Sequence, residues 1–242
     1  MLSIIDAHAH LASLDVEETL ARSHDGGVVA ILSNATRPND WNATLNAAKH
    51  EMVHAALGVH PFFADEWSDA AQARLIQHIE AGNVAAIGEI GLDGFPQYAQ
   101  NMEAQLCTFE AQLKLAQQYN LPVCLHLRKA WSAFFATIKR LGISCLKGYC
   151  HNFTGSVEIA RSLLSLDLHV SLGSSIVNAK HASEAVAEIP LDRLLTETDC
   201  PDMAPSPEHA LTPLNAIAEI KGLPTETIAT IIEQNFRSLL IN

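Results

Sequence analysis

The chain has 242 residues, of which 48% are hydrophobic and 17% are charged, so it has enough apolar side chains to bury one large core and too few charges for a disordered protein. The net charge is −12, from 27 acidic and 15 basic side chains. A surface of this sign repels polyanions, which argues against a protein that wraps a long nucleic acid duplex.

The sequence predicts a cytoplasmic protein with no membrane partner. No apolar run approaches the roughly 18 residues that a membrane-spanning helix needs, and residues 1–6 contain neither a basic segment nor a signal cleavage site. The five cysteines form no C-x-x-C pair and are odd in number, which is typical of reduced thiols in the cytosol. Nothing in the sequence indicates an obligate protein partner.

Eight short apolar runs are expected to form strands. Taking one position at or just past the end of each run gives 8, 34, 60, 89, 126, 151, 173 and 199. Successive positions are separated by 22 to 37 residues, which is enough for one loop, one helix and one strand, the composition of a βα unit. Eight such units predict an α/β fold, a (β/α)8 TIM barrel of about 250 residues, so residues 1–242 are expected to form a single domain.

Helices are expected between the strands, because start and stop signals alternate with the apolar runs. Their expected ranges are 15–22, 68–82, 101–119, 156–166, 212–221 and 225–240. Asp15 and Ser68 are N-cap residues, and Gly26, Gly82 and Gly222 follow the expected carboxyl ends.

Six residues of metal-binding type lie at or just past the ends of these runs: His8, His10, Glu89, His126, His151 and Asp199. His8 and His10 are two positions apart, so their side chains point the same way at the end of a strand. The carboxyl ends of all strands of a barrel gather at one rim. Because buried imidazoles and carboxylates cost free energy unless they are paired or bound to metal, the six residues predict a metal site at that rim.

Imidazole and carboxylate ligands without an obvious thiolate suit zinc, manganese or magnesium and do not select among these ions. Glu89 lies midway round the rim and has two oxygens, so it can bridge two divalent ions. We expect one ion to take His8, His10, Glu89 and Asp199, and the other to take Glu89, His126 and His151. Two ions roughly 3.5–4 Å apart would lower the pKa of a water between them, and Asp199 would accept its proton.

Four neighbours of these residues have open roles. Glu197 and Thr198 are candidates to orient Asp199 or to pack in the core. Cys150 and Cys200, which stand next to expected ligands, are expected to be small buried apolar groups. Oxidation or metal capture near the site is the alternative for these two thiols.

Six segments resemble, in chain order, the motifs of the TatD family of metal-dependent deoxyribonucleases. The segments are DAHAHL at 6–11, GVHP at 58–61, GEIGLD at 88–93, PVCLHLR at 122–128, HNFTG at 151–155 and ETDCP at 197–201. The resemblance extends over nearly the whole chain, and as a series these motifs are highly specific. The resemblance implies an amidohydrolase-like barrel, a divalent metal centre with the ligands above, and hydrolysis of phosphodiesters, often from a 3′ end of DNA or RNA.

The resemblance also implies roles for two residues outside the ligand set. His60 and Asp93 are implied to face the substrate or to support the site, and we count His60 with Glu89 and Asp199 as catalytic. From the residues alone, His60 before Pro61 is also read as a strand terminator with a capping imidazole. Asp93 is equally a turn residue.

Several basic residues follow strand ends and predict a local positive rim. They are Arg37, Arg128, Lys129, Lys180 and His181. We expect Arg128 to bind substrate. Solvated loop charges are the alternative, because lysines and arginines are common in loops.

The chain departs from the family after the fourth strand and after the last one. Residues 94–98 read GFPQY where many relatives carry a basic segment, and residues 199–220 contain no lysine or arginine. These changes weaken the expected grip on phosphate. Phe95, Tyr98 and Phe153 are candidates either to stack on a base, because aromatic stacking tolerates any base, or to pack on the barrel.

Three classes of function follow from these observations. The favoured class is a metal-dependent phosphodiesterase, a 3′-5′ exodeoxyribonuclease that acts on nucleic acid ends or short oligonucleotides. The second is a carboxylic ester or amide hydrolase such as a D-aminoacyl-tRNA deacylase, because activated water also attacks a carbonyl carbon and the surface is acidic. The third is a non-catalytic metal-binding module, and the intact ligand set weighs against it.

Overall fold

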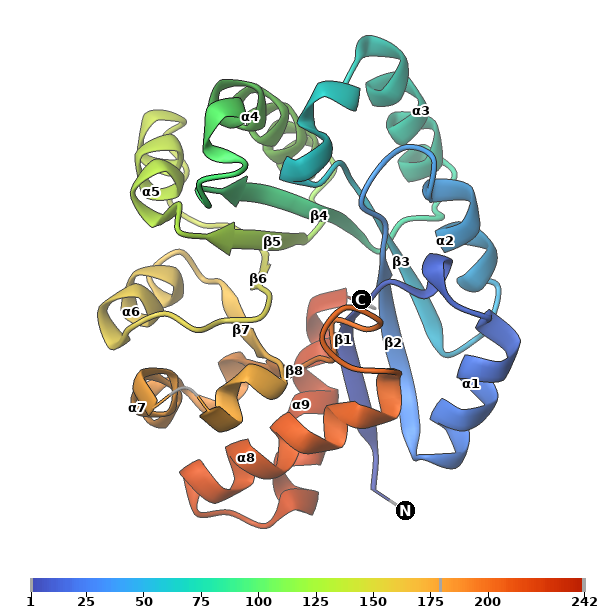
Figure 1. The fold of residues 1–242 in the computed structure, drawn as a ribbon, viewed down its shortest axis with the longest axis vertical. Coiled ribbons are helices and arrows are strands. Elements are labelled where there is room, and N and C mark those ends of the chain that lie inside the picture. Colours follow the sequence, from blue (N-terminus) through green and yellow to red (C-terminus); the bar gives the residue numbers. More distant parts are fainter. Residues whose placement is uncertain (1, 179, 241–242) are drawn as a thin grey trace.

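The computed structural model of the chain describes residues 2–178 and 180–240. Eight strands, all parallel, form one sheet in which each strand pairs with the next in the sequence (Figure 1). They are β1 Ile4–Ala9, β2 Val28–Asn34, β3 Val53–Leu57, β4 Ala86–Asp93, β5 Val123–Arg128, β6 Gly148–Cys150, β7 His169–Leu172 and β8 Leu194–Thr196. The predicted (β/α)8 barrel is confirmed.

The barrel is nearly closed by the segments that follow its first and last strands. The backbone N–H of His10 donates to the carbonyl of Cys200 at 2.8 Å, and the N–H of Asp199 donates to the carbonyl of His8 at 2.8 Å. The residues that close the barrel are therefore the expected metal ligands and their neighbours.

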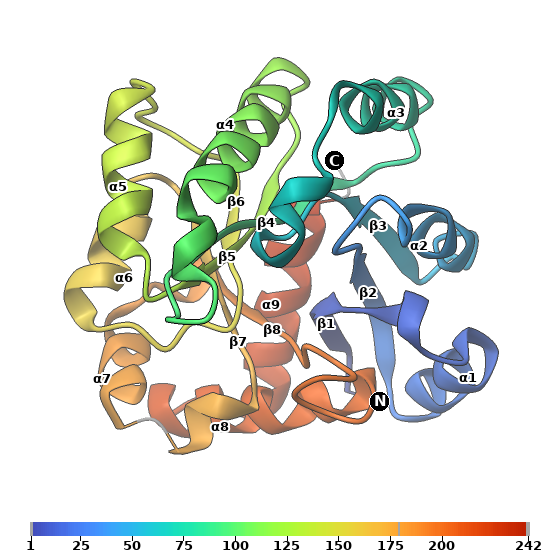
Figure 2. The ribbon, with the colours of Figure 1, turned by 45° about the horizontal axis from the view of Figure 1, so that its top comes forward.

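Helices surround the strands, as Figure 2 shows. Six of them match the expected helices: α1 Val16–Asp25, α3 Asp69–Glu80, α4 Met102–Gln118, α6 Val157–Leu164, α8 Leu211–Lys221 and α9 Thr225–Leu240. The Asp15 side chain caps α1 and the Ser68 side chain caps α3, as predicted. The structure adds α2 Trp41–Ala47, α5 Trp131–Arg140 and α7 Lys180–Glu188. The N-cap residue of α5 is Ala130, which has no capping side chain, whereas that of α2 is Asp40, whose side chain makes no capping hydrogen bond.

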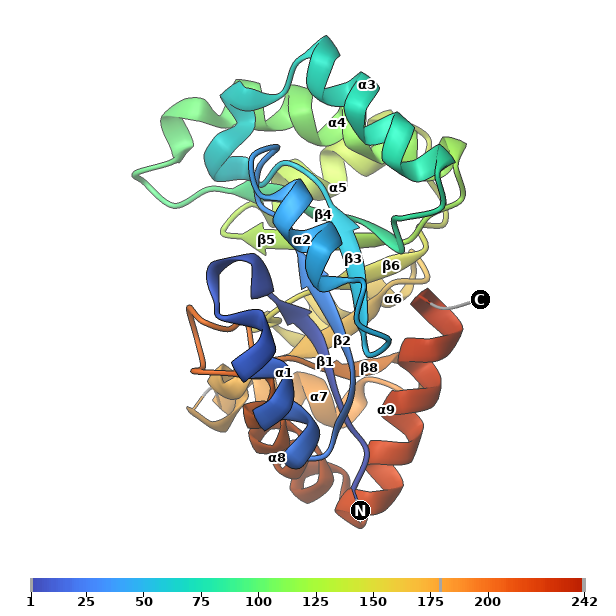
Figure 3. The same ribbon diagram turned by 90° about the vertical axis from the view of Figure 1, so that its right-hand side faces the viewer.

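The last helix, α9, lies at the amino-terminal ends of the strands. The Asn235 amide donates to the carbonyls of Leu191 and Leu194 at 2.8 Å, beside the start of β8. Leu239 and Leu240 line a cavity with the segments that lead into β4 and β5. In Figure 3, α9 and the loop that follows β8 lie on opposite sides of the barrel. The last helix therefore does not cover the carboxyl ends of the strands.

The core of the described residues is apolar and continuous, and its largest fully buried side chains include Trp41, Tyr149, Phe109 and Phe134. Gly91 permits the close contact between β4 and β5. Its φ is 153°, and a Cβ at this position would stand 1.9 Å from the carbonyl oxygen of His126. Among the described residues, no helix is long and apolar enough to cross a membrane.

Two buried glutamines of α4 hold the segments that follow β3 and the end of β4. Gln112 accepts the backbone N–H of Val59 at 2.7 Å and donates to the carbonyl of the same residue at 3.0 Å. Gln105 accepts the N–H of Asp93 at 2.8 Å and donates to its carbonyl at 3.2 Å. Each glutamine therefore satisfies both backbone polar groups of one residue. Together the two glutamines fix the backbone beside His60 and at Asp93.

Candidate metal centre

Glu89, on β4, lies at the centre of a cluster of imidazoles. Its Oε2 atom lies 3.3 Å from Nε2 of His8 and 3.5 Å from Nε2 of His10. The same two nitrogens lie 3.7 and 3.2 Å from Oδ1 of Asp199. The first expected ligand set is therefore brought together, because the carboxyl ends of parallel strands meet at one rim of a barrel.

The Oε1 atom of Glu89 faces a second group of imidazoles. It lies 2.9 Å from Nδ1 of His126, 3.0 Å from Nε2 of His151 and 3.3 Å from Nε2 of His60. These residues come from β5, from the segment after β6 and from the segment after β3. The two oxygens of one carboxylate thus face different sets of imidazoles, which is the geometry that a bridging carboxylate requires.

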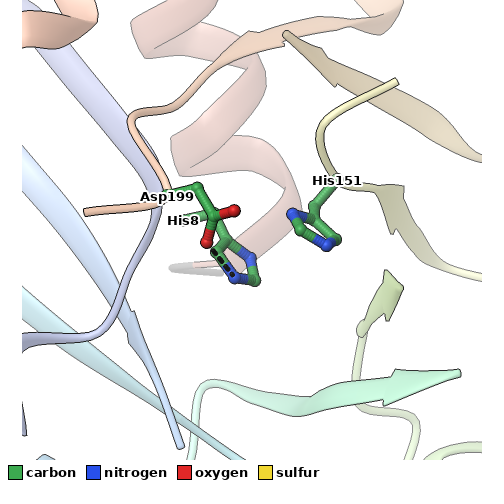
Figure 4. Close-up of side chains that lie close together, drawn as sticks. All are labelled: His8, His151 and Asp199. Atoms are coloured by element: carbon green, nitrogen blue, oxygen red, sulfur yellow. Dashed lines mark ion pairs between the residues drawn. The ribbon is translucent and has the colours of Figure 1, made fainter. Parts of the chain in front are cut away.

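Figure 4 shows His8, Asp199 and His151 approaching one another from different strands, with the ion pair between His8 and Asp199 marked. The rings of His8 and His151 are stacked, with centroids 4.1 Å apart and 16° between their planes. One ligand atom of each of the three residues lies within 4.8 Å of the others. The two expected ligand sets are therefore in direct contact.

In four histidines, the ring nitrogen that does not face Glu89 meets a group of the protein that can accept a hydrogen bond from it. The pairs are His8 Nδ1 with Cys124 Sγ at 3.0 Å, His10 Nδ1 with the Asn34 carbonyl at 2.9 Å, His126 Nε2 with Asp93 Oδ2 at 3.2 Å, and His151 Nδ1 with Glu197 Oε1 at 3.3 Å. A proton on the outer nitrogen leaves a lone pair on the inner one, which is what a metal ligand needs. The donor set therefore fits divalent cations.

His60 has the opposite orientation. Its Nδ1 atom accepts the backbone N–H of Phe62 at 3.1 Å, so the proton of the neutral ring is on Nε2, which faces Glu89. Burial lowers the pKa of His60 to about 4 and keeps the ring neutral. His60 therefore donates a hydrogen bond to Glu89, and this geometry supports a role beside the ligands.

Burial opposes a positive charge on every imidazole of the cluster, and the neighbouring carboxylates favour it. At His8 burial prevails and lowers the pKa. At His10 burial is overcome by the hydrogen bond with Asp199 and the charge of Glu89, which raise the pKa to about 9. At His151 burial is overcome chiefly by the charge of Glu89, and the pKa lies well above its usual value. Without a cation, the rings of His10 and His151 are therefore positively charged.

Glu197 contacts His151, although the sequence suggests that it orients Asp199. Asp199 lies beyond the end of β8 and has a left-handed backbone, with a φ of 52°. Strand alternation therefore does not extend to this residue. The Thr198 hydroxyl donates to Asp6, so this residue ties the end of β8 to β1.

Cys150 and Cys200 are 1% and 0% exposed, which agrees with the expectation of small buried groups. Burial raises the pKa of both thiols, that of Cys200 to about 12. Both are therefore protonated at neutral pH, a form that neither binds metal nor attacks as a nucleophile.

A cavity of about 850 Å³ opens above the cluster, and its basic and acidic lining residues come from the ends of different strands. Residues at or after the ends of β3, β4 and β5 contribute aromatic and basic side chains, namely Phe62, Phe95, Arg128, Lys129 and Trp131. Residues that follow β8 and β2 contribute the carboxylates of Asp202 and Asp40. Asp202 was not expected from the sequence, and it lies in one group with His10 and Asp199, with ligand atoms within 4.8 Å of one another.

Arg128 and Lys129 lie at the edge of this cavity. The guanidinium carbon of Arg128 lies 4.2 Å from the ring centroid of Phe95, and Nζ of Lys129 lies 4.4 Å from the same centroid. Arg128 Nη1 also lies 4.0 Å from Oδ2 of Asp93. The expected positive rim is therefore present at the end of β5.

The other basic residues of the expected rim are placed differently. Arg37 forms an ion pair with Glu66, which balances its charge. The side chains of Lys180 and His181 lie outside the described residues. The local positive charge at the cavity therefore rests on the two cations after β5.

None of the three aromatic candidates presents a free ring to this cavity. Phe153 is 1% exposed and the Phe95 ring carries the two cations. Tyr98 is stacked on Phe62, with centroids 3.7 Å apart, and does not line the cavity. Phe62 itself is 36% exposed and lines the cavity. The sequence analysis missed it, although it stands two positions after His60 in the segment that follows β3.

Comparisons with known proteins identify related metal-dependent hydrolases. Residues 5–241 match the family model described as TatD related DNase. The chain is 33% identical over 251 residues to the uncharacterized metal-dependent hydrolase YabD of Bacillus subtilis, covering 98% of both chains. It is also 33% identical over 242 residues to the 3′-5′ ssDNA/RNA exonuclease TatD of Pantoea vagans, covering 93% of both.

Among solved structures, the crystal structure of YjjV, a TatD homolog from Escherichia coli K12, superposes with a TM-score of 0.90. The two sequences are 32% identical, and the match covers 99% of this chain and 98% of YjjV. A TatD family hydrolase from Entamoeba histolytica has the same fold, with a TM-score of 0.88 at 22% identity. The chain therefore belongs to the TatD family of metal-dependent hydrolases.

Proposed function

We propose that this hydrolase is a two-metal phosphodiesterase that removes nucleotides from the 3′ ends of single-stranded DNA or RNA. The observation that carries the proposal is the carboxylate of Glu89, whose two oxygens face separate sets of imidazoles. Two cations held side by side suit in-line displacement at phosphorus. The exonuclease named for the Pantoea vagans relative supports the same reaction.

The ligand sets follow from the distances around Glu89. We assign one divalent ion to His8, His10, Glu89 and Asp199, and the other to Glu89, His126 and His151. When bound, the ions would supply Lewis acidity, which lowers the pKa of the attacking water and offsets charge on the phosphoryl oxygens. Zinc, manganese and magnesium are all compatible with this mixed donor set.

Asp199 is assigned to receive the proton of the attacking water. Its side chain is 14% exposed, compared with 3% for Glu89, and it lines the cavity, so it can reach a bound substrate. Burial opposes its charge, but the hydrogen bond from His10 holds its pKa below the usual value. The carboxylate is therefore ionised at neutral pH, as a general base must be.

Three further residues are assigned either to support the ligands or to bind the substrate. His60 donates to Glu89 and lines the cavity. Asp93 is a positioning residue, because its carboxylate accepts a hydrogen bond from the outer nitrogen of His126. Arg128 lines the cavity with its side chain 52% exposed and is assigned to hold a substrate phosphate.

The test is an assay in which the metal is controlled. Metal-free protein is reconstituted with Mg²⁺, Mn²⁺ or Zn²⁺ and incubated with single-stranded DNA and RNA labelled at the 5′ end. We expect products that shorten from the 3′ end, and no shortening with chelator or with Glu89→Ala. Glu103→Ala, an exposed carboxylate on α4, is the matched control and should retain activity. A protein that holds metal and shortens neither polymer under any of the three ions would contradict the proposal.

A second candidate is supported by the carboxylates of the cavity. Asp40 and Asp202 line it and would attract a free amino group and repel an additional phosphate. Such a site suits an ester or amide hydrolase acting on an aminoacyl ester, such as a D-aminoacyl-tRNA. Aminoacyl esters belong in the same assay panel, and turnover of these substrates without phosphodiesterase activity would favour this candidate.

A further inference from the structure

We infer that the face of the Phe62 ring turned away from Tyr98 is a stacking platform for the base of the nucleotide at the reacting end of the strand. Phe62 lies in the 3-10 segment Pro61–Glu66 that follows β3, and it lines the cavity above the cluster. It is 36% exposed, while most large apolar side chains of the described residues are covered. An aromatic ring left open inside a cavity is a surface on which a planar ligand can stack. The platform serves the nuclease proposed above and rests on that proposal.

The orientation of the Phe62 ring is fixed by its neighbours. Tyr98 is stacked on it, with ring centroids 3.7 Å apart and 20° between the planes. His60 packs edge-on, with centroids 4.3 Å apart and 81° between the planes. The backbone N–H of Phe62 donates to Nδ1 of His60 at 3.1 Å. A base that stacks on this ring therefore does not have to order it first, which reduces the entropic cost of binding.

The other aromatic rings of the cavity are less suited to this role. Arg128 and Lys129 cover the Phe95 ring, at 4.2 and 4.4 Å from its centroid. Trp131 packs edge-on against Phe153, with centroids 6.2 Å apart. Phe62, in contrast, is in ring contact with imidazoles of the cluster.

The distance from Phe62 to the cluster places the base next to the reacting phosphate. Its ring centroid lies 5.9 Å from that of His126 and 4.3 Å from that of His60, and both histidines contact Glu89. A base on Phe62 therefore lies within the reach of one nucleotide from a phosphate held at the cluster.

The charges around the cavity indicate the direction in which the strand continues. Arg128 and Lys129 follow β5, on the same part of the rim as Phe62, and can hold the next phosphate. Asp40 and Asp202 line the cavity after β2 and β8 and would repel that phosphate. We therefore expect the strand to leave the cavity over the end of β5.

Stacking on Phe62 has two consequences for substrate choice. The base must be unpaired, so a single-stranded or frayed end is required. Every base has a π-face, so the platform accepts all four bases with only modest preference.

The experiment compares two single-stranded DNAs of one sequence, one with an ordinary 3′-terminal nucleotide and one with an abasic 3′-terminal sugar. We measure kcat/KM for each in the presence of metal, and binding of each by fluorescence anisotropy in the presence of chelator. For the wild-type protein we expect a preference of roughly 5- to 100-fold for the terminal base, the range that stacking of one base on an aromatic ring gives. Phe62→Ala should reduce the ratio to about one, and Phe62→Trp should retain it.

Phe95→Ala is the matched control, because the ring that it removes is already covered, and it should keep the preference. A kcat/KM ratio near one in the wild-type protein, or a preference that persists in Phe62→Ala, overturns the platform. In either case, cleavage of both DNAs leaves the nuclease proposal intact. If neither DNA is cleaved, binding decides. Affinity that depends on the base and on Phe62 supports the platform and counts against the nuclease, whereas equal affinity, or no binding, overturns the platform.

Discussion

Glu197 Oε1 lies 3.3 Å from Nδ1 of His151, on the side of the ring away from Glu89. The same oxygen accepts the backbone N–H of Asn152 at 2.8 Å, which fixes its position. A carboxylate behind a ligating imidazole sets the tautomer and makes the inner nitrogen a stronger donor. Glu197 therefore fixes the orientation of His151, one of the imidazoles that face Glu89.

Glu197→Gln is expected to weaken metal binding by about 10- to 100-fold, the usual effect of removing such a partner. The substitution keeps the shape of the side chain and removes its charge. Affinity is measured by competition with a chromophoric chelator. Glu103→Gln on the exposed face of α4 serves as the control. Equal affinities of Glu197→Gln and the wild-type protein would show that the carboxylate only packs.

Asp199→Asn is expected to lower kcat by about 10²- to 10⁴-fold, because the amide cannot accept the proton of the attacking water. The assay is initial-rate kinetics on single-stranded DNA, with the bound metal measured in the same samples. Asp25→Asn, at a side chain that is 89% exposed, is the control. A large loss of metal would instead assign Asp199 mainly to ligation, and unchanged kcat would exclude it as the base.

Metal binding is expected to release protons at neutral pH. In the metal-free protein the pKa of His10 is about 9 and that of His151 is raised, so both imidazoles are protonated at pH 7, while a bound cation needs their lone pairs. Apparent affinity should therefore rise as the pH rises toward the His10 pKa of about 9. Calorimetry at pH 7.5 in two buffers of different ionisation enthalpy counts the protons. The same binding enthalpy in both buffers would refute this expectation.

Gln112→Leu is expected to lower the free energy of unfolding by about 1–3 kcal/mol, because it leaves the buried peptide groups of Val59 without a partner. Chemical denaturation of metal-free protein measures the change. Gln117→Leu, at an exposed position of the same helix, should change it by less than about 0.5 kcal/mol. A small effect of Gln112→Leu would mean that water replaces the glutamine.

Much of the fold follows from local patterns in the sequence. The eight apolar runs and their spacing predict parallel strands in sequential order, because a βα unit has a narrow range of lengths. Helices with a capping side chain, such as α1 and α3, are predicted near their true starts. The helix α5 is not predicted, because Ala130 at its start has no capping side chain, and α2 is not predicted although Asp40 stands at its start.

Local patterns predict which residues gather at the rim, because the apolar runs mark the strand ends and those ends meet at one side of a barrel. How these residues face one another depends on tertiary contacts. The contact of His60 with Glu89, the contact of Glu197 with His151 and the stacking of Phe62 on Tyr98 each join segments that follow different strands. The left-handed backbone of Asp199, beyond the end of β8, is likewise not predicted by strand alternation. Such features are set by contacts between distant segments, and no local pattern encodes them.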